Sequence, residues 1–171
     1  MTKPEPISHA LTFSSTFSCP AVVLFDVWTS HQHFAHWWPN DHACMYVCES
    51  VLAPQGKVLF QQVAPEGYDV WETLTYHEVK EPDSITYTKS FSSPEGEALV
   101  LPWMSSFPLE VWHKVTFQEE GSATILTIEE APYRATEAEN QAFWFLREAI
   151  LTVLKRKMER LEEYVAKLPK E

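Results

Sequence analysis

Glycine is scarce in this sequence, with four residues in a chain of 171. A dinucleotide-binding fingerprint needs several glycines within one short loop, and neither GxxxxGKS nor GxxxxGKT occurs as a phosphate-cradling loop. The composition therefore excludes the glycine-rich nucleotide-binding classes, and it also excludes collagen-like and glycine-linker designs.

Cysteines and long apolar runs are also few. Three cysteines make an odd number that does not resemble a disulfide framework. No apolar run approaches the ~18 residues of a membrane span, and residues 1–10 combine two prolines and a glutamate without the apolar centre of a secretory signal. We therefore expect a cytoplasmic protein with no membrane partner.

An excess of basic residues is absent as well. The net charge is −11, and the acidic excess lies in residues 1–136, which contain 17 acids and six bases. Nucleic-acid binding requires a basic surface that displaces counterions from phosphates. We therefore expect no nucleic-acid partner, and attraction to anionic membranes is disfavoured for the same reason.

Aromatic residues are abundant: the chain has seven Trp, ten Phe and six Tyr. Its length suits one domain, which we place at residues 9–168 after a polar tail at 1–8. A domain of this size buries ~70% of the surface of its unfolded chain. Many aromatic rings can therefore lie in its interior.

Alternating apolar residues and turn signals predict seven strands, at 9–18, 43–52, 57–63, 68–80, 84–92, 109–119 and 123–131. Two short helices are expected between the first two strands, from Pro20 to Trp28 and from His31 to Trp38. Thr136 and Glu139 form a capping-box pattern that begins a long amphipathic helix reaching Leu168. The apolar face of such a helix must be buried against another element, and a curved seven-stranded antiparallel sheet wrapped around the helix can bury it.

Six short segments, in this order along the chain, resemble the C-terminal domain of the activator of Hsp90 ATPase, a branch of the Bet v 1/START-like (SRPBCC) superfamily; they lie at 25–29, 36–39, 78–88, 108–117, 124–128 and 132–143. The resemblance implies an α+β helix-grip fold and a pocket between the sheet and the last helix. One departure is Val153-Leu154, where relatives usually carry Gly-Trp. A glycine there leaves room for a ligand, so we expect Val153 to narrow the cavity.

Within that fold we predict non-enzymatic binding of a small hydrophobic or aromatic molecule, with no cofactor. The candidate ligand-binding residues are aromatic: Trp38, Phe60, Trp71, Tyr87, Phe91, Trp103, Trp112, Phe143 and Trp144. Glu72 and Lys89 lie on strands that line such a pocket, where either could fix a polar end of a ligand or simply face solvent.

Two other functions are alternatives. A protein-interaction module similar to the Hsp90 activator would expose a patch around Trp37 and Trp38. A polyketide cyclase or hydrolase would use polar pocket groups such as Tyr87, Thr75 or His77, although the sequence identifies no catalytic residue. A Trp-containing loop at 101–112 could also be buried in a homodimer.

Histidines and cysteines are the candidate metal ligands. His33 and His36 have the i, i+3 spacing that could share a metal, but no carboxylate completes a helical triad. Cys44 and Cys48 would lie ~13 Å apart on one face of a strand, too far for a disulfide. We interpret the histidines as exposed helix residues and these cysteines as small buried hydrophobic residues, and we predict no metal site.

Overall fold

A computed structural model describes residues 9–67 and 69–169. The predicted tail at 1–8 lies outside the described residues. Seven strands are present: β1 (Leu11–Phe17), β2 (Cys44–Ser50), β3 (Lys57–Val63), β4 (Asp69–Lys80), β5 (Ser84–Ser92), β6 (Glu110–Glu120) and β7 (Ala123–Tyr133). The helices are α1 (Ala21–Thr29), α2 (His31–Trp37), the short 3-10 turn η1 (Pro102–Met104), α3 (Glu137–Phe145) and α4 (Arg147–Ala166).

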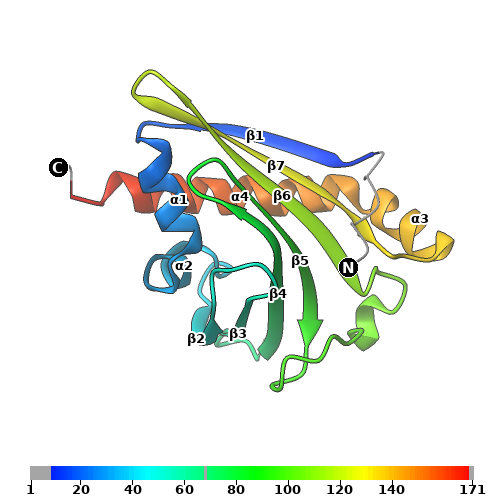
Figure 1. Cartoon of the computed structure of the whole chain (residues 1–171). Helices are drawn as coiled ribbons and strands as arrows, with labels where there is room; N and C mark the ends of the chain where they lie inside the picture. Colours follow the sequence, from blue (N-terminus) through cyan, green and yellow to red (C-terminus); the bar gives the residue numbers. More distant parts are fainter. Residues whose placement is uncertain (1–8, 68, 170–171) are drawn as a thin grey trace.

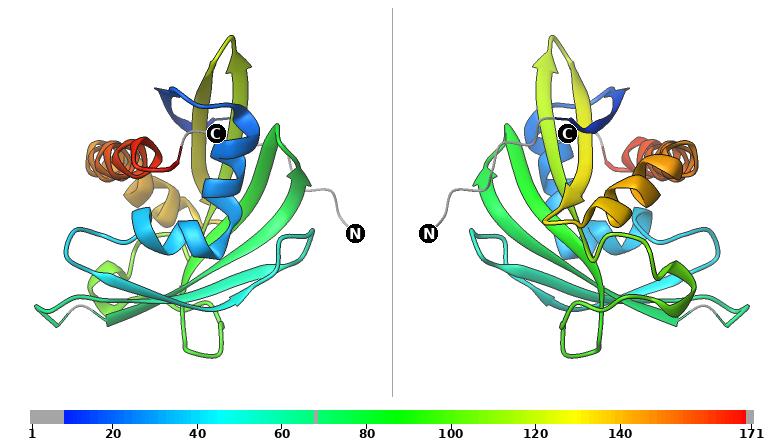
Figure 2. Two further views of the ribbon diagram at one scale, coloured as in Figure 1. Left: turned by 90° about the vertical axis from the view of Figure 1, so that its left-hand side faces the viewer. Right: turned by 90° about the vertical axis from the view of Figure 1, so that its right-hand side faces the viewer.

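The strands form one antiparallel sheet in the order β1-β7-β6-β5-β4-β3-β2. Consecutive strands from β2 to β7 are neighbours, so that part of the sheet is a meander, and β1 closes the far edge against β7. The sheet curves round α4, while α1 and α2 lie across one end of it (Figures 1 and 2). The helix-grip prediction is confirmed, and each predicted strand is found with ends that differ by two residues at most.

The C-terminal helix differs from its prediction, because it is two helices and not one. The chain leaves helical geometry at Leu146, whose φ and ψ are −89° and 5°. The bend lets Phe143 of α3 join a small core with Leu11 and Val111, separate from the main core that α4 contacts. The predicted capping box is present, since the Thr136 N–H donates to Glu139 Oε2 at 2.7 Å and the Glu139 N–H donates to Thr136 Oγ1.

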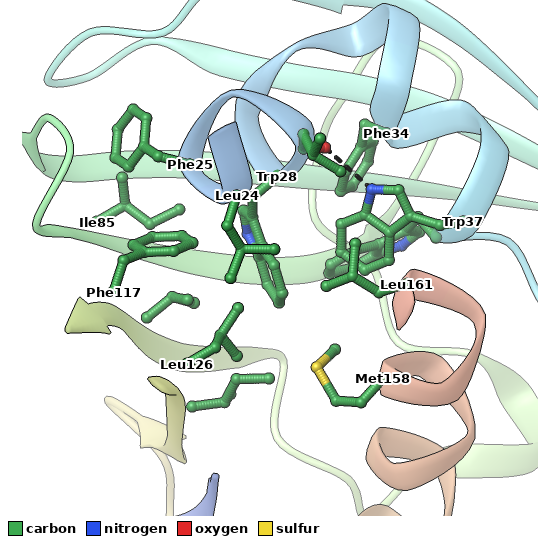
Figure 3. Packing of buried hydrophobic residues seen from close by; sticks show 14 of the residues in the cluster. Leu24, Phe25, Trp28, Phe34, Trp37, Ile85, Phe117, Leu126, Met158 and Leu161 are labelled. Carbon is green, nitrogen blue, oxygen red and sulfur yellow. Dashed lines mark hydrogen bonds between the residues drawn. The ribbon is translucent and has the colours of Figure 1, made fainter. Parts of the chain in front are cut away.

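One end of the space between sheet and helix is filled by aromatic side chains. Trp28 and Trp37 pack with their ring centres 4.8 Å apart, and Trp37 Nε1 donates to the Val27 carbonyl at 3.0 Å. Figure 3 shows Leu161 and Met158 of α4 reaching this cluster from the opposite side. Many of the abundant aromatic residues therefore fill the interior at this end.

Leu161 is fully buried in this cluster, so its truncation should create a cavity. We expect Leu161→Ala to lower the free energy of unfolding by about 2–5 kcal/mol. Leu52→Ala is the matched control, because Leu52 is 39% exposed, and it should change stability by no more than about 0.5 kcal/mol. Urea unfolding followed by Trp fluorescence measures both, and equal effects at the two sites would contradict this packing.

Candidate functional site

A cavity of about 330 Å³ occupies the other part of the space between the sheet and α4. This volume is at the lower end of the ~300–1,000 Å³ typical of small-molecule sites. Its apolar part is formed by the 101–109 loop and the α3–α4 region, through Met104, Phe107, Pro108, Leu109, Leu146, Ile150, Val153 and Leu154. Its polar part is formed by Gln62, Glu72, Lys89, His113, Glu130 and Lys157. The cavity is thus amphipathic.

Glu72 and Lys89 form the first ion pair of the polar part. Lys89 Nζ lies 3.4 Å from Glu72 Oε1, and the Glu72 side chain is almost fully buried. The other carboxylate oxygen, Oε2, accepts a hydrogen bond from Gln62 Nε2. Gln62 Oε1 in turn accepts from the backbone N–H of Asn40 at 3.1 Å. Both oxygens of the buried carboxylate are therefore partnered, as burial of a charge requires.

His113 and Glu130 form the second pair, directly opposite each other in the register of β6 and β7. His113 Nε2 lies 3.0 Å from Glu130 Oε1, and Nδ1 lies 3.0 Å from the Val111 carbonyl oxygen. Both ring nitrogens therefore face acceptors, which an imidazolium beside a carboxylate satisfies. Burial alone would raise the pKa of Glu130, but His113, with Lys89 and Lys157, holds that pKa below its usual value.

Lys157 reaches the same cavity from α4, and its side chain is buried. Its Nζ lies 3.5 Å from the centre of the Trp38 ring. Among residues 9–67 and 69–169, no carboxylate oxygen lies within 4.0 Å of this amine, because Glu72 and Glu130 are engaged by Lys89 and His113. Burial, and next the positive charge of Lys89, lower the pKa of Lys157 to about 7, although Glu72 and Glu130 oppose the shift.

The sequence-predicted aromatic site residues are distributed over several environments. Phe91 lines the cavity. Trp38 is buried behind Lys157, and Phe60 and Tyr87 are buried in the main core. The Tyr87 ring also stacks on His113, with centres 4.8 Å apart. Tyr87 therefore supports the polar part of the cavity from within the core.

The other predicted aromatic residues lie outside the cavity lining. Trp71 adjoins Glu72, and Trp112 adjoins His113, so both tryptophans face the other side of the sheet, because successive strand residues alternate. Phe143 is buried in the small core, and Trp144 packs against it. Trp103 is 69% exposed on the 101–109 loop, so the predicted homodimer contact stays a prediction.

Sequence reasoning missed His113, Glu130 and Lys157, although each carries a signal. His113 alternates with Val111 and Val115, and Glu130 follows the buried face of β7, so both are polar residues at inward positions. Lys157 lies three residues after Leu154 and four before Leu161 on the apolar stripe of α4. A titratable residue at a core position of an otherwise regular pattern is thus the feature that marks this site.

The residues weighed for other chemistry lie elsewhere. His77 contacts Thr88 Oγ1 and lies against Tyr133, and neither His77 nor Thr75 lines the cavity. Burial raises the pKa of Tyr87 well above its ordinary value, so its hydroxyl stays protonated at neutral pH. In the part of the chain that the structure describes, Tyr87, Thr75 and His77 therefore do not form a catalytic dyad for the cyclase or hydrolase interpretation.

The candidate metal ligands form no metal centre among the described residues. His33 Nδ1 lies 2.8 Å from the Tyr164 hydroxyl, and His36 stacks on the same tyrosine. Cys44 and Cys48 are exposed, so the prediction that they are buried is wrong. Cys44 lies on the outer face of β2, since its neighbour Met45 is buried, and Cys48 lies at an irregularity in the β2–β3 pairing between Val47 and Glu49.

The fold and the cavity define an α+β helix-grip protein, and comparison with known proteins agrees. The model of the family described as Activator of Hsp90 ATPase homolog 1-like protein matches residues 18–165, so the chain belongs to that family. No curated protein sequence matches it. None of the described helices is long and apolar enough to span a membrane.

Solved structures share the fold at low sequence identity. A Mycobacterium smegmatis protein has a TM-score of 0.73 and 17% identity, covering 94% of this chain and 93% of its own. An Arthrobacter aurescens protein has a TM-score of 0.75 and 14% identity, with coverages of 94% and 89%. A Staphylococcus epidermidis protein has a TM-score of 0.68 and 20% identity, with coverages of 99% and 98%.

The lowered pKa of Lys157 predicts a stability that rises with pH. Between the folded pKa of about 7 and the ordinary value of 10.5, the unfolded chain binds more protons at this site. From about pH 7 to about pH 8.5, the free energy of unfolding of the wild type should rise by about 1–2 kcal/mol more than that of Lys157→Met. Urea unfolding at the two pH values tests this, and parallel pH profiles would contradict it.

Proposed function

We propose that this protein binds a small amphipathic molecule, with an apolar body and one polar head, and that it is a binding protein and not an enzyme. The observation that carries the proposal is the division of the cavity. An apolar part at Phe107, Leu146 and Ile150 leads to a wall of buried charged residues. Glu72 and Lys89, and His113 and Glu130, are partnered with each other. A purely apolar ligand would leave the amine of Lys157, which has no carboxylate oxygen within 4.0 Å among the described residues, without a hydrogen-bond partner, and that is costly inside a protein.

Apolar burial supplies the main driving force. Removing ~200 Å² of apolar ligand surface from water contributes about 5 kcal/mol at ~25 cal/mol per Å². Loss of ligand freedom offsets part of this. The polar head then orients the ligand, because it must replace the water that would otherwise solvate Lys157 and the two ion pairs.

We also propose a cytoplasmic location, which the three free cysteines support.

The Hsp90-activator alternative required an exposed apolar patch around Trp37 and Trp38. Both side chains are buried, at 0% and 3% exposure, because α2 turns them into the aromatic core. That patch was predicted wrongly. Membership of the family therefore does not by itself favour a co-chaperone function over ligand binding in the cavity.

The test of the proposed function uses 1-octanol, which combines an alkyl chain with one hydroxyl head. Isothermal titration calorimetry should detect one saturable site with a negative heat-capacity change. Val153→Trp should weaken binding at least about tenfold, since Val153 lines the cavity and a larger side chain fills it.

Val22→Trp on α1 is the matched control. Val22 is 55% exposed and Val153 is 54% exposed, but Val22 is not part of the cavity lining. This variant should bind 1-octanol as the wild type does. Absence of a saturable heat with 1-octanol, or equal weakening by the two substitutions, would contradict binding in this cavity.

A further inference from the structure

Within the described part of the chain, Lys157 is the cavity cation without a counter-ion of its own. The remaining charges form two pairs, Lys89 with Glu72 and His113 with Glu130. A protonated Lys157 would therefore leave an extra positive charge in a buried space that is already balanced. The neutral amine avoids that charge, and it has a free lone pair on a residue that lines the cavity.

Other groups around Lys157 support this assignment of charge. Lys89 and Arg160 oppose a further positive charge near it, whereas Glu72 and Glu130 favour one. The Trp38 ring face, 3.5 Å from Nζ, also attracts a cation. The pKa of about 7 is the balance of burial and these effects, so the free amine is accessible at neutral pH. An exposed lysine, with a pKa near 10.4, is neutral in fewer than about one molecule in a thousand.

We infer that Lys157 is a nucleophile that binds aldehydes or ketones carrying an apolar tail, as a reversible imine. This names the ligand class of the cavity, and it rests on the proposed function. The inference stands on the buried, unpaired amine at the polar end of an apolar cavity. A carbonyl group is the polar head that the neutral amine can bind covalently, whereas a carboxylate could only pair with its protonated form.

The reaction balances without any further reagent. The Nζ lone pair forms a bond to the carbonyl carbon, and one amine proton moves to the carbonyl oxygen to give a carbinolamine. The carbinolamine C–O bond then breaks, and its hydroxyl group leaves as water together with the second amine proton. A C=N bond to Lys157 remains. Lys89 and the His113 imidazolium face the same cavity and can pass protons during the transfer.

Octanal with sodium cyanoborohydride tests the inference on the full chain, because reduction converts the imine into a permanent octyl-amine. Intact-mass measurement should show one octyl group per chain, and peptide mapping should place it at Lys157. Trapping at Lys157 should be at least about tenfold faster than at Lys155, which is exposed on the same helix. A Lys155→Met variant should be trapped as the wild type is.

Lys157→Met and Lys157→Arg should both lose the adduct, and circular dichroism shows whether each variant is folded. If neither folds, the peptide map of the wild type decides by itself. Equal labelling of Lys157 and exposed lysines, or no adduct at Lys157, would overturn the inference. Calorimetry of the wild type with 1-octanol separates the two claims: 1-octanol binding without octanal trapping defeats only the imine, whereas failure to bind 1-octanol defeats the proposed function.

Discussion

A lysine on the buried face of α4, with no carboxylate to pair with among the residues that the structure describes, is the constraint around which the site is arranged. Lys157 lies one turn from Leu154 and one from Leu161, where a core helix ordinarily carries an apolar residue. Its amine cannot be covered by further apolar side chains without a large desolvation cost. The interior beside it therefore remains open, lined by charges that the sheet pairs with one another.

The space between the sheet and α4 is packed by different sets of residues at its two ends. Toward α1 and α2, Trp28, Trp37 and Phe117 close the space with ring-to-ring packing. Toward α3, the chain bends at Leu146 and takes Phe143 into a separate small core. The cavity occupies the interval between these two packed regions. Rigid packing on both sides gives it a defined shape, which specific binding of a small molecule requires.

Much of the fold could be predicted from the sequence because its signals are local. Period-two alternation and Pro- or Gly-containing turns identify the strands, and Thr136 with Glu139 identifies the start of α3. The break at Leu146 could not be predicted, since no proline or glycine marks it and the packing of Phe143 beside it involves residues distant in sequence, Leu11 and Val111. The arrangement of the sheet around the last helix was predicted chiefly from the family resemblance and not from any single sequence pattern.

The site was only partly predictable. Phe91 was predicted as an aromatic ligand-binding residue, and Glu72 and Lys89 were expected on pocket-lining strands, where either could bind a ligand or face solvent; all three line the cavity. The larger aromatic set was chosen by residue type, which does not say on which side of the sheet Trp71 or Trp112 lies. The decisive groups, His113, Glu130 and Lys157, are polar residues at core positions, and their pairing depends on strand register and on how α4 crosses the sheet.

The titration of Lys157 tests this account most directly. Carbon-13 NMR of lysine Cε, with the Lys157 signal assigned by its loss in Lys157→Arg, reports the charge on the amine as pH is varied. The account predicts a midpoint at about pH 7 for Lys157, well below the midpoints of the exposed lysines. A midpoint near 10.4, the ordinary value for a solvated lysine, would show that the amine is not both buried and unpaired and would contradict the account.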